Sequence, residues 1–361
     1  MAPVILALRS TQWAECRVLL SGQHRALLDQ TLEQFGVAAD YDLNLMEPGQ
    51  TLGRLTGTAF TRFDAALREL KPDFVLAQGD TTTAMVAALS CFYQEIPFGH
   101  VEAGLRTGNK RMPFPEEVNR RIAGLVADLH FAPTQRAVDA LLREGTPAQT
   151  IFLTGNTVID NLARYGPQVS PLALPATERL ILLTAHRREN FGEPMRGALQ
   201  AVSDIVKSFP NVRVLFPVHP NPQVKAIAYE ILDGMQRVSL VDPLGYFEFI
   251  AAMKASHLVL TDSGGVQEEA PWFSKPVLVL REESERPEAI EMGAAALVGL
   301  DRSRIRAKLE ELLTDRALYA TMSQSCSPYG DGLASQRIAE HVGRYLGHAV
   351  ETSPPPFRNL S

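Results

Sequence analysis

The sequence predicts an α/β protein built from two doubly wound, Rossmann-like domains that face a central cleft. Its 361 residues are enough for two domains of about 150 residues each. Short apolar runs alternate with longer helical stretches along the whole chain. Most of these runs are continuous rather than alternating, which is typical of strands buried on both faces of a parallel sheet.

The first half of the chain supplies one such series. It opens with a helix over 1–9 that has Pro3 in its first turn. Strands are then expected at 17–20, 74–77, 98–101, 129–132 and 151–154. Helices are expected at 24–35, 84–93 and 135–143.

The segment 166–175 contains three prolines and divides the chain into domains 1–166 and 167–333. Strands of the second series are expected at 180–184, 212–217, 238–241, 258–261, 276–280 and 295–298, with helices at 195–207 and 302–313. A last helix at 334–346 is expected to pack back on the first domain. The tail 347–361 follows, and its proline run 353–356 predicts disorder.

Composition excludes several classes of protein. With 35 Lys and Arg against 41 Asp and Glu, the net charge of −6 gives no reason to expect a nucleic-acid or anionic-membrane partner. No apolar run is long enough to span a bilayer. Cys16, Cys91 and Cys326 lie far apart, which excludes a disulfide framework and a cysteine zinc site and fits a reducing cytoplasm.

Acidic residues follow two strands of the first domain. Asp80 comes after the strand at 74–77, where it could either cap the next helix or serve a ligand. Glu102 follows the strand at 98–101 with no helix directly after it to cap, so a functional role is favoured. Glu116 and Glu117 follow a proline, and from spacing alone their charges suit the first turn of a helix.

Basic residues follow two strands of the second domain. His186 and Arg187 come directly after the strand at 180–184, in a position suited to a phosphate or leaving group. His219 repeats this placement after the next strand, although a single histidine there is more often structural.

The most distinctive local motif is 261–269. Gly264 and Gly265 lie between a buried strand and a helix, where the helix N-terminus offers free N–H groups to a diphosphate. Glu269 could accept hydrogen bonds from two ribose hydroxyls. Phe249 could stack on a base, although a core position is favoured by spacing alone. The motif is neither a dinucleotide fingerprint nor a Walker loop.

At these motifs the chain closely resembles the bacterial non-hydrolysing UDP-N-acetylglucosamine 2-epimerases. The resemblance runs from residue 1 to about residue 346 and rests on the blocks 22–25, 78–83, 99–106, 113–120, 131–134, 154–157, 186–190, 262–269 and 285–288. It implies the two-domain glycosyltransferase-B fold and a homodimer. It also implies reversible inversion at carbon 2 of the sugar, giving UDP-N-acetylmannosamine without a metal or redox cofactor.

The resemblance also implies roles for particular residues. Asp80, Glu102, Glu116 and His186 fall on the family's catalytic positions. Its ligand positions correspond to Arg120, His219, Phe249, Ser263, Gly264, Gly265 and Glu269. Substrate is also reported to act as an activator in members of this family, and Gln23 and Arg187 are our candidates for that second site.

The implied route eliminates UDP to form a 2-acetamidoglucal and then adds it back, with a proton delivered to the opposite face. Such a reaction needs acid/base groups on both faces of the ring. A hydrolysing epimerase that releases N-acetylmannosamine and UDP is one alternative. A binding protein without catalysis is another, because relatives begin with a strand and a Gly-Thr-Arg-Pro-Glu loop that this chain lacks. We expect that a misplaced start explains their absence.

Overall fold

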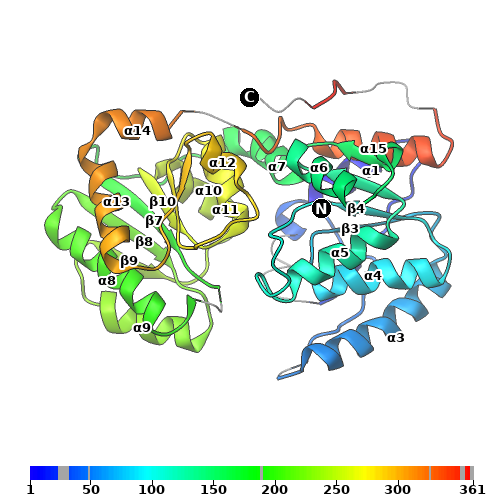
Figure 1. Cartoon of the computed structure of the whole chain (residues 1–361), viewed down its shortest axis with the longest axis horizontal. Coiled ribbons are helices and arrows are strands. Elements are labelled where there is room, and N and C mark those ends of the chain that lie inside the picture. Colours follow the sequence, from blue (N-terminus) through cyan, green and yellow to red (C-terminus); the bar gives the residue numbers. More distant parts are fainter. Residues whose placement is uncertain (23–31, 48, 188–189, 325–326, 350–353, 358–361) are drawn as a thin grey trace. The chain divides into compact units, whose positions relative to one another are not determined.

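The computed structural model describes residues 1–22, 32–47, 49–187, 190–324, 327–349 and 354–357. These divide into two compact units. The first comprises Met1–Ala163 and the segment that begins at Tyr329, and the second comprises Arg164–Pro328. Both contain parallel sheets covered by helices, so the predicted α/β class is confirmed (Figure 1).

The first unit contains a four-stranded and a two-stranded parallel sheet. The larger one has the strand order β3-β4-β5-β6, in which neighbours in space are also neighbours in the chain. The smaller one pairs β1 with β2. The bounds are β1 Leu19–Leu20, β2 Tyr41–Asp42, β3 Val75–Gln78, β4 Phe98–Val101, β5 Leu129–Ala132 and β6 Ile151–Leu153.

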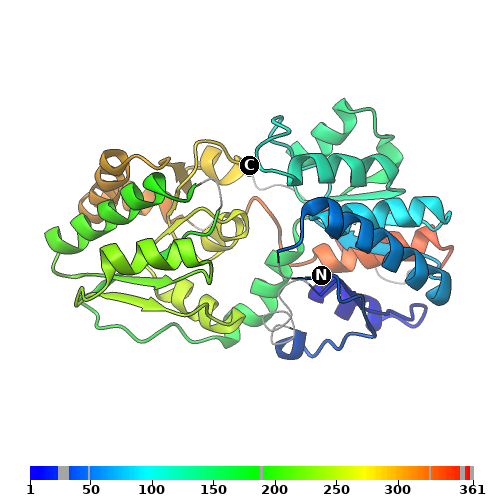
Figure 2. The same cartoon turned by 90° about the horizontal axis from the view of Figure 1, so that it is seen from below.

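Helices cover the larger sheet of this unit. Apolar residues of α3, α4 and α5 pack together with β3 and β4, and α3 runs beside α4 in two perpendicular views (Figures 1 and 2). The helix α15 packs on α1, and both share an apolar cluster with β4 and β5. The bounds are α1 Ala2–Arg9, α3 Leu52–Leu70, α4 Thr82–Tyr93, α5 Glu116–Val126, α6 Gln135–Arg143, α7 Thr157–Tyr165 and α15 Ala334–Tyr345.

The second unit is a doubly wound domain. Its six parallel strands have the order β12-β11-β10-β7-β8-β9, so the sheet grows outward from the neighbouring pair β7 and β10 in both directions. The strand bounds are β7 Arg179–Thr184, β8 Val212–Pro217, β9 Val238–Val241, β10 Leu258–Thr261, β11 Val277–Val279 and β12 Ala295–Leu297.

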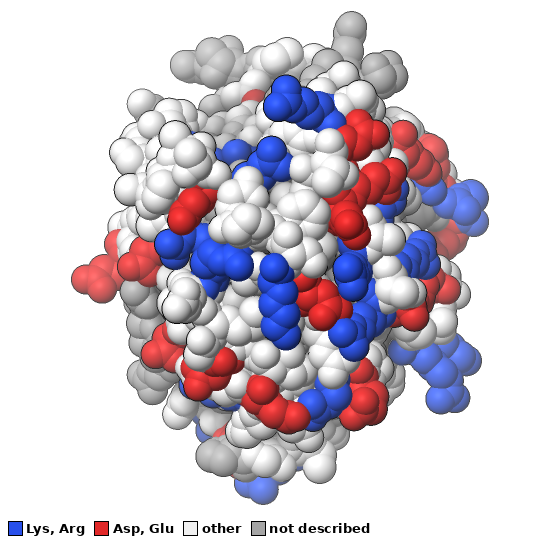
Figure 3. All heavy atoms as spheres, turned by 90° about the vertical axis from the view of Figure 1, so that its left-hand side faces the viewer, with Lys and Arg blue, Asp and Glu red and all other residues white. Residues whose placement is uncertain are grey.

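The main core of this unit joins α8, α9 and α13 to the sheet, and α10, α11 and α12 lie on its other face (Figure 1). The helix bounds are α8 Glu193–Ser208, α9 Pro222–Leu232, α10 Tyr246–Ala255, α11 Gly264–Trp272, α12 Glu288–Glu291, α13 Arg302–Thr314 and α14 Arg316–Met322. On the face of this unit drawn in Figure 3, Lys and Arg side chains are interspersed with Asp and Glu side chains.

The structure matches every predicted strand to within a few residues and adds β2, α3 and several shorter helices. The predicted helix at 24–35 falls mostly outside the described residues. The disorder predicted for 353–356 is wrong for residues 354–356. Arg337 Nε donates to the carbonyl of Pro355 at 2.9 Å, and the Arg337 guanidinium lies over the ring of buried Phe357. A search of the described helices finds no membrane-spanning candidate.

Candidate functional site

Two neighbouring strands of the first unit place acidic side chains at the same edge of a sheet. β3 pairs with β4 in parallel, with Gln78 opposite Val101, so the turn at 78–80 lies beside Glu102. Gln78 Nε2 donates to Glu102 Oε2 at 3.4 Å. A Cβ on Gly79 would lie 3.6 Å from that same oxygen. The carboxylate of Glu102 therefore extends over the turn that carries Asp80.

Asp80 is held by a buried arginine. Arg120 of α5 bonds to Asp80 Oδ2 through Nη2 at 2.5 Å and through Nε at 3.1 Å. Arg120 Nη1 also lies 3.3 Å from Glu117 Oε2, and Glu117 is fully buried. Asn119 Nδ2 donates to the backbone carbonyl of Asp80 at 2.9 Å. These contacts fix Asp80 against the first turns of α5.

Glu116 is the first residue of α5, one turn before Arg120. Residues four apart on a helix share a face, so Glu116 lies on the side of α5 that holds Asp80. Its Oε2 is buried and has no hydrogen-bond partner among the described residues. Glu117 instead accepts the N–H groups of Thr107 and Gly108, which orders the preceding loop. Both carboxylates lie in the first turn of α5, as their spacing predicts. Glu117 is hydrogen-bonded there, whereas Oε2 of Glu116 has no partner among the described residues.

The backbone of Glu102 has the left-handed conformation, with φ of 67°. This region disfavours side chains larger than glycine, and such residues concentrate at functional sites. Beneath it, His100 of β4 is buried, and its Nε2 lies 2.8 Å from the carbonyl of Gly79. Burial lowers the pKa of His100 to about 4, so it is a neutral support for the turn.

In the second unit, the ends of β7 and β10 lie side by side, with Thr184 opposite Thr261. Asp262 follows β10 and is fully buried. Its Oδ1 lies 3.1 Å from His186 Nδ1. The ring of His186 stacks at 5.9 Å on the ring of His219, which follows β8. Both predicted histidines thus meet at one edge of this sheet.

The N-terminus of α11 lies directly after Asp262. Ser263 is its N-cap residue, and its hydroxyl caps no helix N–H among the described contacts. The first N–H groups of a helix lack intrahelical acceptors and attract anions. Gly264 lets another side chain approach closely, because a Cβ there would lie 2.5 Å from Arg286 Nη1. The helix terminus and a guanidinium therefore place positive potential together.

Arg286 belongs to a buried ionic network. Its Nη1 bonds to Glu285 at 2.5 Å, and its Nε donates to Glu268. Arg281 bonds to the other oxygen of Glu285 at 2.8 Å. Against the effect of burial, the two arginines lower the pKa of Glu285 to about 2. The guanidinium beside Gly264 is thus held firmly in place.

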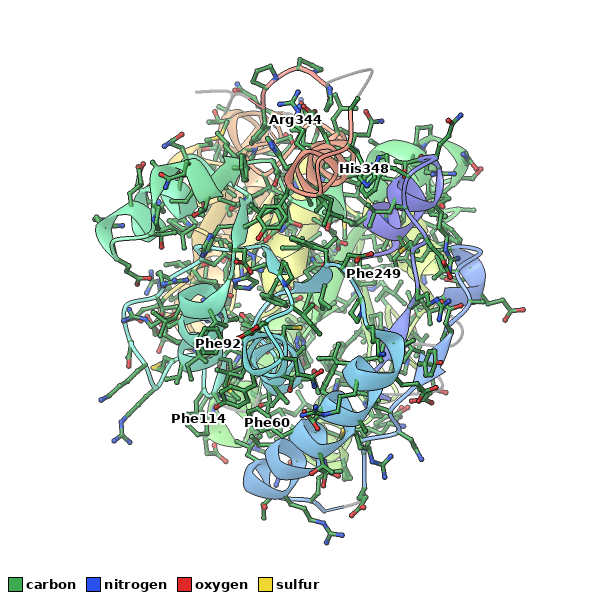
Figure 4. The ribbon with its side chains drawn as sticks, turned by 90° about the vertical axis from the view of Figure 1, so that its right-hand side faces the viewer. Phe60, Phe92, Phe114, Phe249, Arg344 and His348 are labelled. Carbon is green, nitrogen blue, oxygen red and sulfur yellow. The ribbon has the colours of Figure 1, made fainter. Side chains whose placement is uncertain are left out.

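Glu269 lies in the second turn of α11. Burial raises the pKa of its carboxyl to about 7. Phe249 lies half-buried on α10 and is labelled in Figure 4. Arg187 Nη2 lies 3.8 Å from Glu285 Oε1, whereas Gln23, the other candidate for an activator site, lies outside the described residues.

Sequence reasoning missed Asp262 as part of the site, together with the contact that Asn190 makes to it. Asn190 Nδ2 donates to Asp262 Oδ2 at 3.0 Å. Asp262 directly follows a strand, as Glu102 does, so the same pattern could have identified it. The sequence analysis instead assigned the function of this motif to the glycines that follow Asp262. Within the described chain, no group of three or more His, Cys, Asp and Glu side chains could hold a metal ion.

Known proteins resemble this chain over nearly its whole length. The sequence model of the family described as UDP-N-acetylglucosamine 2-epimerase matches residues 6–343. The UDP-N-acetylglucosamine 2-epimerase of Bacillus subtilis is 48% identical over 354 residues, covering 97% of this chain and 93% of the relative. The Escherichia coli K12 protein of the same name is 45% identical, covering 94% of each.

Solved structures agree with these relatives. The S. aureus MnaA-UDP co-structure has a TM-score of 0.93 at 41% identity, covering 99% of this chain and 96% of that one. The Neisseria meningitidis UDP-GlcNAc 2-epimerase bound to UDP-GlcNAc has a TM-score of 0.91 at 40% identity, covering 95% and 96%. These matches confirm the predicted glycosyltransferase-B type of α/β fold.

Proposed function

The chain belongs to the UDP-N-acetylglucosamine 2-epimerase family of isomerases, and we propose that it interconverts UDP-N-acetylglucosamine and UDP-N-acetylmannosamine without hydrolysis. The reaction eliminates UDP to a 2-acetamidoglucal and adds it back with a proton on the opposite face of carbon 2. The observation that carries this proposal is the clustering of acidic side chains around Asp80 in the first unit. Such groups suit the transfer of a carbon-bound proton.

The acid/base work is assigned to Asp80, Glu102 and Glu116. The hydrogen on carbon 2 is not acidified by a carbonyl group, so its removal must accompany departure of UDP from carbon 1. One carboxylate accepts that proton, and a carboxylic acid on the other face returns one. The buried Oε2 of Glu116, which has no hydrogen-bond partner in the described chain, suits it to proton exchange. Arg120 orients Asp80.

The departure of UDP is assigned to the second unit. The N-terminus of α11 at Ser263, Gly264 and Gly265 offers N–H donors to the diphosphate. His186 contributes a donor whose ring is fixed by Asp262. His219 adds a second imidazole beside it. Glu269 is assigned to the ribose hydroxyls and Phe249 to the uracil ring. Solved relatives that bind UDP and UDP-GlcNAc support this assignment.

The hydrolysing reaction is distinguished by its products. We propose incubation of the chain with UDP-N-acetylglucosamine in D₂O, followed by proton NMR, with chelator added to a parallel sample. The expected result is UDP-N-acetylmannosamine that carries deuterium at carbon 2, equally with and without chelator. Accumulation of free N-acetylmannosamine and UDP would instead establish the hydrolysing reaction. Retention of protium at carbon 2 would rule out elimination and re-addition.

The same experiment tests a purely binding role. A chain that binds UDP-N-acetylglucosamine, as measured by calorimetry, but never exchanges the hydrogen at carbon 2 would be a binding protein. Turnover by the 361-residue chain itself rejects the binding role.

We further propose that substrate activates the enzyme at a second site, for which Arg187 is the described candidate. Arg187 Nε is buried without a hydrogen-bond partner among the described residues, although its Nη2 lies near Glu285. Arg187 therefore has an N–H left to donate to an anion. Activation by UDP-N-acetylglucosamine predicts that the rate of epimerisation depends sigmoidally on the concentration of UDP-N-acetylglucosamine. Arg187→Ala is expected to flatten that dependence, and a hyperbolic wild-type curve would contradict the activator site.

The expected homodimer finds support on the surface of the first unit. Phe92 and Tyr93 at the end of α4 are 59% and 69% exposed, and Phe60 of α3 stacks on Tyr93 at 6.2 Å. Figure 4 labels Phe60, Phe92 and Phe114, which come from α3, α4 and the segment before α5. Gly53 and Gly57 share a stripe of α3 with Phe60; a Cβ on Gly57 would have no atom within 4 Å, and one on Gly53 would have only Thr51 Oγ1, at 4.0 Å. Aromatic side chains beside open helix backbone suit reciprocal packing of two copies.

Light scattering after gel filtration tests the homodimer. The wild-type chain is expected to elute with twice its monomer mass. Phe92→Lys is expected to give monomers, because it places a charge inside the proposed interface. The matched control is Tyr229→Lys on α9, a residue 46% exposed in the second unit. A monomeric wild-type chain would contradict the homodimer, and a dimer unaffected by Phe92→Lys would place its interface elsewhere.

A further inference from the structure

Asp262 is the point at which two loops of the second unit are tied together. Its carboxylate accepts from the backbone N–H of His186 at 2.9 Å, from that of Arg187 at 2.9 Å and from Asn190 Nδ2 at 3.0 Å. Its Oδ1 also lies 3.1 Å from His186 Nδ1. One fully buried side chain thus joins the end of β10 to the loop after β7.

Asp262 stays ionised although it is buried, because these donors stabilise its negative charge. Burial opposes ionisation, but the hydrogen bond and charge of His186, with the backbone donors, bring the pKa of Asp262 below its ordinary value. An ionised carboxylate beside Nδ1 fixes the proton on that nitrogen and sets the plane of the ring. Nε2 then lies on the opposite side of the ring, and the His186 side chain is 39% exposed.

A buried carboxylate is an unexpected neighbour for a diphosphate, since the two repel each other. Asp262 directly precedes Ser263, so its negative charge lies at the helix terminus to which we assign the diphosphate. A neutral asparagine could accept the backbone N–H groups equally well. Its NH₂ group could not accept a hydrogen bond from Nδ1 of His186. The contact with the His186 ring therefore needs a carboxylate, whereas ordering of the two loops does not.

Other described charged side chains near His186 do not hold its ring through Nδ1. Arg187 directs its guanidinium toward Glu285, whose charge is already matched by Arg281 and Arg286. The His219 ring stacks on that of His186, and its Nδ1 accepts the backbone N–H of Asn221 at 3.2 Å. Asp262 is the described carboxylate that contacts the His186 ring.

We propose that Asp262 is a positioning residue for the epimerase reaction, which keeps Nδ1 of His186 protonated so that Nε2 donates a proton to the departing diphosphate. This inference rests on the proposed function. When the bond between carbon 1 and oxygen breaks, the phosphate oxygen takes the electron pair and the proton from Nε2. His186 is left as a neutral imidazole that keeps its Nδ1 proton and donates it in a hydrogen bond to Asp262. In the return step Nε2 recovers the proton as the bond to carbon 1 forms again.

A double-mutant cycle over Asp262→Asn and His186→Asn tests this coupling in the full chain, with kcat and KM measured across a range of pH. Asp262→Asn is expected to lower kcat about 10–100-fold, the usual cost of losing the partner of a functional histidine, and to shift the pH profile of kcat. In the His186→Asn background the same change is expected to cost little, because no imidazole remains to be positioned. Asn190→Ala, which removes another contact to Asp262 but leaves the ring pair, is expected to retain the wild-type pH profile.

An equal loss from Asp262→Asn in both backgrounds would show that Asp262 only supports the loops and would overturn the proposal. Nitrogen-15 NMR of the His186 ring provides a readout that does not depend on the variants folding. In the wild-type chain Nδ1 is expected to carry a proton throughout the active pH range, and an unprotonated Nδ1 there would also overturn the proposal. Unchanged turnover in His186→Asn alone would instead contradict the proposed function of His186.

Discussion

The carboxylates Asp80 and Glu116 of the first unit and the carboxylates Asp262 and Glu285 of the second unit differ in how they are hydrogen-bonded. In the second unit, Asp262 meets several donors, and Glu285 is bonded to Arg281 and Arg286. In the first unit, Asp80 is held by Arg120, but Oε2 of Glu116 is buried without a hydrogen-bond partner among the described residues. Satisfied charges favour a rigid binding surface, whereas an unsatisfied carboxylate oxygen suits proton exchange.

From this difference we expect the carboxylates of the first unit to act in catalysis and the residues around α11 to act in nucleotide binding. Changes to the carboxylates of the first unit should lower kcat with little effect on nucleotide affinity. Changes around α11 should weaken nucleotide binding first. The variants below test that separation, and each can be compared with the wild-type chain for folding by its thermal transition.

The largest effect is expected from Glu116→Gln. The amide keeps the size of the side chain but cannot accept or return a proton, so kcat should fall about 10²–10⁴-fold. KM should change little, because we assign the nucleotide contacts to the second unit. Steady-state kinetics measure both. Asp139→Asn, at an exposed residue of α6, is the matched control, and a kcat close to the wild-type value in Glu116→Gln would remove Glu116 from the chemistry.

The next effect is expected from Gly264→Ala. Its Cβ would meet Arg286 Nη1 at 2.5 Å, and the bonds from Arg286 to Glu268 and Glu285 resist movement of that guanidinium. Because the change disturbs the helix terminus assigned to the diphosphate, UDP affinity should fall about 10–100-fold by calorimetry.

Gly265→Ala distinguishes two causes of a lower UDP affinity: disturbance of Arg286 and crowding of the nucleotide itself. No atom lies within 4 Å of a Cβ on Gly265, so this variant should fold like the wild-type chain. A loss of UDP affinity in Gly265→Ala would therefore report crowding of the nucleotide itself. Wild-type affinity in Gly264→Ala would show that the diphosphate does not bind at this helix terminus.

Glu269 predicts a pH dependence of nucleotide binding. Burial raises the pKa of its carboxyl to about 7, so the group takes up a proton as the pH falls through neutrality. Ribose hydroxyls donate to the ionised form, so binding of UDP-N-acetylglucosamine should weaken up to about tenfold between about pH 8 and pH 6. Calorimetry at several pH values measures this change.

The Glu269→Gln variant isolates that contribution. It should lack the part of the pH dependence that comes from Glu269, so the ratio of wild-type to variant affinity should fall as the pH falls. Glu310→Gln, at an exposed residue of α13 in the same unit, should keep the wild-type profile. Parallel profiles for the wild type and Glu269→Gln would contradict the assignment of the ribose to Glu269.

The smallest effect is expected from Phe249→Ala. Loss of stacking on a base costs about 1 kcal/mol at the low end, or about fivefold in UDP affinity. If Phe249 were instead a core residue without contact to uracil, the variant would lower the thermal transition and leave UDP affinity unchanged. Comparison of calorimetry with thermal unfolding distinguishes the two outcomes.

Much of the fold could be predicted from the sequence. The strands β7, β10 and β11 contain continuous apolar runs with turn residues on either side, and the structure has them where the pattern places them. The strand β2 was not predicted, because two residues carry no periodicity. The helix α3 was not predicted either. The family, indicated by its motif blocks, is confirmed.

Site residues were found where they directly follow strands, as with Glu102 and His186. Their partners were harder to find, since hydrogen bonding between loops distant in the chain leaves no local pattern. Arg120 lies forty residues from Asp80, and Asp262 lies 76 residues from His186. The tail at 354–357 was misjudged for the same reason, because its contacts depend on the distant Arg337.

The most direct test of this division is the affinity for UDP of a variant that combines Asp80→Asn, Glu102→Gln and Glu116→Gln. Calorimetry of the folded variant is predicted to give a dissociation constant close to that of the wild-type chain, although turnover of UDP-N-acetylglucosamine is lost. A nucleotide affinity that falls along with turnover, or a turnover that persists, would contradict the separation of catalysis from binding.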